Sequence, residues 1–142
     1  MRNIDKGKIG EEKAKAYLVK AGYKFVESNY KVKGSEIDLI FIEPVKQQIK
    51  ELDKDILEGK INKDLRSGLI KNMQNILVFV EVKSRSSKKF GEPFEAVNYF
   101  KQKHIQRGAE QFKREYNLDN VMTRFDIVSI VGENIEHIKD VF

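Results

Sequence analysis

The sequence Val78-Phe79-Val80-Glu81-Val82-Lys83 is a run of β-forming residues with an acid and a base at its end. Side chains two residues apart on a strand point to the same face, so Glu81 and Lys83 should emerge together. A lone charge is costly to bury, and a hydrophobic strand gains no packing from either residue. The two side chains therefore form either a structural ion pair or part of a functional site.

A second apolar run, Glu36-Ile37-Asp38-Leu39-Ile40-Phe41-Ile42, also carries an unexpected charge. It is apolar on both faces, as a central strand is. Regular alternation places Asp38 on the same face as Glu36 and Ile40. An acid inside such a strand needs a partner or a metal ion.

The spacing of apolar residues predicts a helix from about Lys6 to Ala21, ended by Gly22. Glu11 lies at the inner edge of its apolar face, where it could reach a site. A Glu in the first turn is equally favoured by the helix dipole. The predicted buried face consists of Gly10, Ala14, Tyr17, Leu18 and Ala21.

A second helix is predicted from about Phe94 to Tyr116, with Pro93 in its first turn. Lys101 lies in the middle of its apolar arc. Either the stem of Lys101 packs while its ammonium group reaches solvent, or Lys101 faces the same site as Asp38 and Glu81. The arc contains Phe94, Val97, Ile105, Gly108, Ala109, Phe112 and Tyr116.

Further strands are predicted at Tyr23–Val32, Thr123–Val131 and Ile135–Ile138. The element order is α-β-β-insert-β-α-β-β, which indicates an α/β fold with a mixed sheet flanked by helices. The first three strands should form an antiparallel meander. The long helix makes the next connection a crossover, which favours a parallel, right-handed pairing.

Asp126 is one more acid within an apolar strand. We expect it to pair with Arg124 or with a loop amide rather than to join the site.

The segment from Glu43 to Asn75 contains Pro44, Gly59 and Gly68 and a nearly balanced set of charges. We interpret it as an insertion, part helical and part mobile, because structureless loops of this length are uncommon in compact domains. A protein contact, a flap over the site and a tolerated insert are the three open roles.

Length and composition favour a single globular domain over residues 1–142, with 40% hydrophobic and 35% charged residues. The absence of cysteine excludes disulfides and thiolate metal sites. Residues 1–10 contain no apolar signal segment, and no run reaches membrane-spanning length. We therefore expect a cytoplasmic protein that does not contact a membrane.

The net charge of +5 is concentrated in one segment, residues 83–107. A local basic surface suits nucleic acid, and a solvated basic face on a basic protein is an equally good interpretation. The basic residues of this segment are Lys83, Arg85, Lys88, Lys89, Lys101, Lys103 and Arg107.

If the two central strands pair with Asp38 beside Glu81, two carboxylates meet within reach of one cation. Hard oxygen ligands suit Mg²⁺ or Mn²⁺, and such an ion beside a phosphate can polarise it and activate water. Lys83 could orient the attacking water, Glu11 could add a ligand, and Lys101 could contact the phosphate. Each residue type has a role in phosphodiester hydrolysis.

These motifs resemble those of the YraN family of small bacterial proteins. The resemblance covers nearly the whole chain outside the insertion, and it rests on the following segments: Gly7–Glu11, Ser35–Ile40, Val78–Arg85, Gly91–Pro93, Glu95–Val97, Lys101, Lys103, Arg124–Val128 and Ile135–Ile138. Ser35 stands where family members usually carry Gly, and the insertion stretches the Asp38–Glu81 separation to 43 residues.

That family resembles the PD-(D/E)XK nucleases, including archaeal Holliday-junction resolvases. The resemblance implies a restriction-endonuclease-like fold, with Asp38 and Glu81 as metal ligands, Lys83 as the catalytic lysine and Glu11 as the helical acid. It also implies DNA, including branched DNA, as substrate, and a homodimer. The residues expected to bind nucleic acid are Arg85, Lys88, Lys89, Lys101, Lys103 and Arg107.

Three functions are consistent with these residues. The first is a metal-dependent nuclease, and the second is a nucleic-acid-binding module with the same fold and no turnover. The third is an interaction protein that uses its insertion, with Glu81 and Lys83 as a structural ion pair. Metal-dependent cleavage of a substrate panel would separate them.

Overall fold

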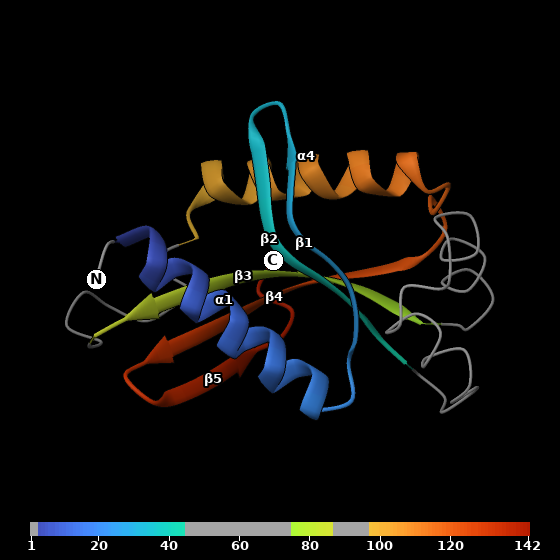
Figure 1. Cartoon of the computed structure of the whole chain (residues 1–142). Helices are drawn as coiled ribbons and strands as arrows, with labels where there is room; N and C mark the ends of the chain where they lie inside the picture. The colour runs from blue at the N-terminus through green and yellow to red at the C-terminus, as the bar shows by residue number, and fades with distance from the viewer. Residues whose placement is uncertain (1–2, 45–74, 87–96) are drawn as a thin grey trace.

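The computed structural model of the chain describes residues 3–44, 75–86 and 97–142, with side chains from residue 7 onward (Figure 1). The predicted order of elements is confirmed within these residues, whereas most of the predicted insertion lies outside them. That the chain forms a single domain remains a prediction. The elements are α1 (Asn3–Lys20), β1 (Lys24–Val32), β2 (Ser35–Glu43), β3 (Ile76–Arg85), α4 (Tyr99–Glu115), β4 (Met122–Val131) and β5 (Asn134–Ile138).

The five strands form one mixed sheet in the order β1-β2-β3-β4-β5. β1, β2 and β3 pair antiparallel, as predicted for a meander, and β4 and β5 form an antiparallel hairpin. β3 and β4 pair parallel, and the connection between them contains α4. The predicted mixed sheet with a helical crossover is therefore confirmed.

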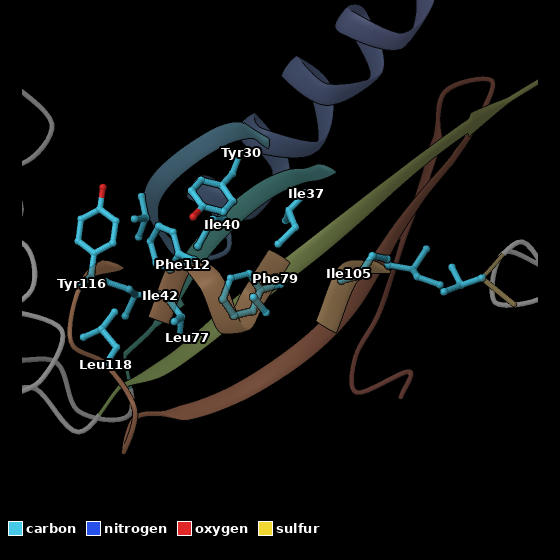
Figure 2. Close-up of a cluster of buried hydrophobic side chains, with 14 residues drawn as sticks. Tyr30, Ile37, Ile40, Ile42, Leu77, Phe79, Ile105, Phe112, Tyr116 and Leu118 are labelled. Carbon is cyan, nitrogen blue, oxygen red and sulfur yellow. The ribbon is translucent and has the colours of Figure 1, made fainter. Parts of the chain in front are cut away.

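The two helices bury opposite faces of the sheet. Phe112 of α4 packs with Phe79 of β3 and Tyr30 of β1 in one core cluster (Figure 2). Leu18 of α1 packs with Phe41 of β2 in the other cluster. Among the described residues, neither helix is long and apolar enough to cross a membrane.

The alternation of faces along β2 is interrupted at Asp38. Ile37 and Ile40 both belong to the α4-side cluster, whereas Leu39 belongs to the α1-side cluster. On β1, Asn29 lies between the partners of Leu39 and Ile37 and has a positive φ of 52°. Asn tolerates this conformation better than most residues do. The strand predicted for residues 36–42 is therefore confirmed as part of β2, but the strict alternation of its faces is not, because Ile37 and Ile40 lie on the same face.

The helix boundaries differ from the prediction. α4 begins at Tyr99 rather than Phe94, because the Asn98 side chain caps the helix by accepting a hydrogen bond from the Lys101 backbone N–H at 3.0 Å. Phe94 lies outside the described residues, and Val97 is buried ahead of the cap.

Two of the residues predicted for the buried face of α1 are exposed. Tyr17 and Ala21 lie in solvent, whereas Gly10, Ala14 and Leu18 are buried as expected.

The close packing of α4 on β2 depends on Gly108. A Cβ atom at this position would collide with the Ser35 hydroxyl and would lie 3.1 Å from Ile37 Cδ1. We expect Gly108→Ala to lower the free energy of unfolding by about 1–3 kcal/mol, because a packed interface must shift to accept the methyl group. Urea denaturation measures this change.

Gly7→Ala is the matched control, since Gly7 lies in α1 with open space around its Cβ position. Alanine is favoured over glycine inside a helix by about 0.5–1 kcal/mol, so this variant should be unchanged or more stable. Equal effects of the two substitutions would contradict a steric role for Gly108.

Candidate functional site

Asp38 lies where β2 and β3 separate. The ladder between these strands extends to the Leu39–Val80 pair, and Asp38 is the next residue of β2. Its Oδ2 accepts a hydrogen bond from the Val82 backbone N–H at 2.8 Å. The side chain thus takes the place of a ladder carbonyl and is fixed against β3 beside Glu81.

Glu81 points to the α4 face of the sheet, because Leu77 and Phe79 of the same strand belong to the α4-side cluster. Lys101 Nζ lies 3.1 Å from Glu81 Oε1. The Glu81 side chain is only 15% exposed, whereas that of Lys101 is 44% exposed. Of the two interpretations of Lys101, the structure therefore agrees with the one in which its side chain faces the predicted site.

The carboxyl groups of Asp38 and Glu81 lie within hydrogen-bonding reach of each other. Burial, and then the charge of Asp38, raises the pKa of Glu81 to about 7, against the lowering effect of Lys101. Burial also raises the pKa of Asp38, although the Val82 N–H and Lys101 oppose the shift. The pair therefore retains a proton at a pH where ordinary carboxyl groups are fully ionised.

This retained proton predicts a pH-dependent gain in stability for Glu81→Gln. Between about pH 4.5 and 7 the folded chain holds a proton at Glu81 that the unfolded chain has released, so stability falls as pH rises. The glutamine variant has no carboxyl group at this position, so its stability does not fall with pH for this reason. We expect it to match the native chain at about pH 4.5 and to exceed it by roughly 2 kcal/mol at about pH 8.

Urea denaturation at both pH values measures this difference, with Glu133→Gln, an exposed turn residue, as the control. A Glu81→Gln variant that is less stable at every pH would instead show that Glu81 and Lys101 form a structural ion pair.

Glu11 of α1 lies near the pair. Burial, and then the charge of Asp38, raises its pKa, whereas a hydrogen bond with the Asn29 side chain lowers it. No cluster of three or more carboxylate, histidine or cysteine side chains suited to a metal ion occurs within the described part of the chain. The predicted ligands Asp38 and Glu81 thus form a pair, with Glu11 outside it.

A carboxylate pair still fits the ion predicted from the sequence. Mg²⁺ commonly binds one or two carboxylates and completes its shell with water and phosphate oxygens. The two carboxyl groups are partly buried, offer only oxygen ligands and lie close enough to interact, which suits a hard cation.

The predicted basic residues are distributed along β3 and α4. Lys83 is exposed two residues beyond Glu81, on the same face of β3 by strand alternation. Arg85 is partly buried, and both Lys103 and Arg107 are exposed on α4. Lys88 and Lys89 lie outside the described residues.

A second polar cluster lies on the α1 side of the sheet, where Asp126 of β4 pairs with Val80 of β3. Arg124 Nε and Nη2 bind the two carboxylate oxygens of Asp126 at 2.8 and 2.7 Å. The Asp140 backbone N–H donates to Asp126 Oδ1 at 3.0 Å. The expectation that Asp126 pairs with Arg124 or a loop amide is confirmed, and both partners are present.

Sequence reasoning missed the other members of this cluster. Arg124 also binds Glu43 at 2.7 Å, and the Tyr23 hydroxyl lies 2.9 Å from Arg124 Nη2. His137 Nε2 lies 2.7 Å from Asp126 Oδ2. Tyr23 begins a predicted strand and Glu43 begins the predicted insertion, and no local pattern shows that they meet.

The fold and the site define a class of protein: a mixed α/β chain with a carboxylate pair where two central strands separate. The chain belongs to the uncharacterised protein family UPF0102, whose model matches residues 10–130.

Relatives within this family cover nearly the whole chain. A UPF0102 protein of Clostridioides difficile is 33% identical over 144 aligned positions, with both chains covered fully. One from Caldanaerobacter subterraneus is 34% identical, also with full coverage of both. One from Caldicellulosiruptor saccharolyticus is 35% identical over 92% of this chain and 85% of its own. None of these names states an activity.

Proposed function

We propose that this chain is a metal-dependent nuclease with a restriction-endonuclease-like fold, acting on DNA and in particular on branched DNA. The observation that carries the proposal is the contact between the carboxyl groups of Asp38 and Glu81 at the separation of β2 and β3. Placing two partly buried acids together costs stability, and acids with pKa values perturbed in this way cluster at functional sites.

A Mg²⁺ or Mn²⁺ ion would be held by Asp38 and Glu81, and Glu11, whose pKa the charge of Asp38 raises, would hold a water molecule beside them. When bound, such an ion polarises a phosphoryl oxygen and lowers the pKa of water. The resemblance to PD-(D/E)XK nucleases supports the same assignment.

The chain's own residues have distinct roles in this proposal. The Val82 N–H orients the Asp38 carboxylate. Lys101, at 3.1 Å from Glu81, supplies a positive charge beside the pair that can contact a phosphate oxygen. Lys83, exposed on the same face of β3, positions the attacking water. Lys103 and Arg107 add positive charge along α4 for the nucleic-acid backbone.

The test uses the full chain with labelled duplex, single-stranded, flap, four-way-junction and RNA substrates. Cleavage in Mg²⁺ or Mn²⁺ that is abolished by chelation supports the proposal, and the preferred substrate identifies the DNA structure. If no substrate is cut in either metal, the nuclease proposal is wrong.

A second candidate is a nucleic-acid-binding protein without turnover. It is favoured by the Lys101–Glu81 ion pair, which already balances one carboxylate without a metal. Binding that weakens steeply with salt, without products in either metal, would identify this function.

The homodimer belongs to the same proposal, because cutting a branched junction requires two sites. Sedimentation of the full chain with and without a four-way junction tests it. A monomer in both states would contradict it.

A further inference from the structure

A polar groove of about 410 Å³ lies between the β1–β2 hairpin and the N-terminal half of α4. Figure 1 shows the hairpin crossing α4 and extending beyond it. The polar lining consists of Lys31, Ser35, Glu36, Lys101 and His104.

Direct contacts fix the two walls of the groove against each other. The Ser35 hydroxyl donates to the His104 backbone carbonyl at 2.5 Å, which joins the start of β2 to α4. Gly108 lets α4 approach Ser35 without a steric clash. At the hairpin turn, Gly34 has a φ of 76°, and Arg107 Nη1 lies 3.2 Å from its Cβ position. A ligand would therefore meet a largely preformed site.

The charge of the groove suits an anion. Lys31 and Lys101 outnumber the single acid of the lining, Glu36, and the imidazole of His104 adds a hydrogen-bond donor. Arg107 extends the positive charge at the hairpin end. Lys31 lies on the hairpin, whereas Lys101, His104 and Arg107 lie on α4. An elongated anion can therefore contact both walls of the groove.

Lys101 connects the groove to the carboxylate pair. It lines the groove and at the same time lies 3.1 Å from Glu81 Oε1. A divalent cation at the carboxylates would compete with the Lys101 ammonium group for Glu81, and Lys101 would then be available to an anion in the groove.

We propose that the groove binds the phosphodiester next to the scissile one on a single DNA strand, through Lys31, His104 and Lys101. This inference rests on the proposed function. It assigns substrate-binding roles to Lys31, which lies outside the basic segment of residues 83–107, and to His104, which lies within that segment. It also predicts that a divalent cation strengthens DNA binding.

The experiment measures binding of a short fluorescein-labelled single DNA strand to the full chain by anisotropy. Ca²⁺ replaces Mg²⁺ so that the strand is not cut. Lys31→Ala and His104→Ala test the groove. His104→Ala keeps the hydrogen bond from the Ser35 hydroxyl, because that bond is accepted by the His104 backbone carbonyl. Lys20→Ala is the control, with the same charge change at the exposed end of α1 on the opposite face of the sheet.

We expect Lys31→Ala to weaken binding by roughly tenfold, as loss of one charged hydrogen bond would. The dependence of log affinity on log salt should become shallower by about 0.7, as for one lost phosphate contact on a single strand. His104→Ala should also weaken binding, and Ca²⁺ should strengthen binding of the native chain. Lys20→Ala should bind as the native chain does.

The outcome separates this inference from the nuclease proposal. If the native chain cuts DNA while the Lys31 and His104 variants bind and cut as it does, the groove assignment is wrong and the nuclease stands. If the native chain cuts nothing but Lys31→Ala loses affinity and Lys20→Ala does not, the groove binds DNA and the nuclease proposal fails. Equal losses in Lys31→Ala and Lys20→Ala would indicate general electrostatic binding and would overturn the inference.

Discussion

Asp38→Asn is expected to lower the rate of metal-dependent DNA cleavage by about 10²-fold or more, because even the outer partners of a metal site contribute 10–100-fold. Asparagine keeps the size of the side chain and an oxygen that can accept the Val82 N–H, so the junction of β2 and β3 is retained. It removes the negative charge that a hard cation requires. Single-turnover cleavage measures the rate, and Mn²⁺ titration calorimetry measures binding directly.

Asp119→Asn is the matched control, since Asp119 is exposed in the turn after α4. It should cut DNA and bind Mn²⁺ as the native chain does. An Asp38→Asn variant with native Mn²⁺ affinity and native cleavage would remove Asp38 from the site. Loss of cleavage with unchanged Mn²⁺ affinity would place the ion elsewhere in the chain.

The largest loss of stability is expected for Arg124→Met, by about 3–5 kcal/mol, because removing one partner of a buried ion pair leaves the other charge uncompensated. Asp126 is 1% exposed and receives two of the guanidinium hydrogen bonds. Burial raises the pKa of Asp126, but hydrogen bonds from His137, Arg124 and the Asp140 N–H together hold it below its ordinary value. Urea denaturation near neutral pH measures the change.

Arg114→Met serves as the control for Arg124→Met, since Arg114 is exposed on α4 and should change stability by less than about 0.5 kcal/mol. Adding Asp126→Asn to Arg124→Met should recover part of the loss, because the uncompensated charge is then absent. A double variant no better than Arg124→Met would show that packing of the arginine stem, rather than charge, stabilises this part of the sheet.

The core of the site could be predicted because its charges interrupt apolar patterns. Asp38 and Glu81 lie in runs that otherwise predict buried strands, and Lys101 lies in an apolar helical arc. Such residues need partners, and the structure brings Glu81 together with both of the others. The sheet order followed from the same patterns, since a helix between two strands favours a parallel pair.

What the sequence did not predict depends on contacts between distant segments. The interruption of β2 at Asp38 accompanies a positive φ at Asn29 of the neighbouring strand, and neither residue shows this alone. The hydrogen bond between Tyr23 and Glu43 likewise forms only once β2 and the start of β1 are in place.

The misplaced start of α4 has a local cause. Pro93 is a helix-start signal, and the apolar residues Phe94 and Val97 continued the periodic pattern behind it. Asn98 is the stronger signal, because its side chain can accept the first free N–H groups. Helix periodicity alone does not distinguish a buried residue before the cap from one within the helix.

The pairing of Glu43 with Ile76 separates the geometry of the site from the length of the chain between β2 and β3. This pair begins the ladder that ends at Leu39 and Val80, so Asp38 and Glu81 keep the spacing of neighbouring strands whatever the connection contains. Doubling a connection costs only about 0.6 kcal/mol of closure entropy. The connection between β2 and β3 can therefore be lengthened or shortened by many residues. A reporter domain inserted into this connection would leave the two carboxylates where they are.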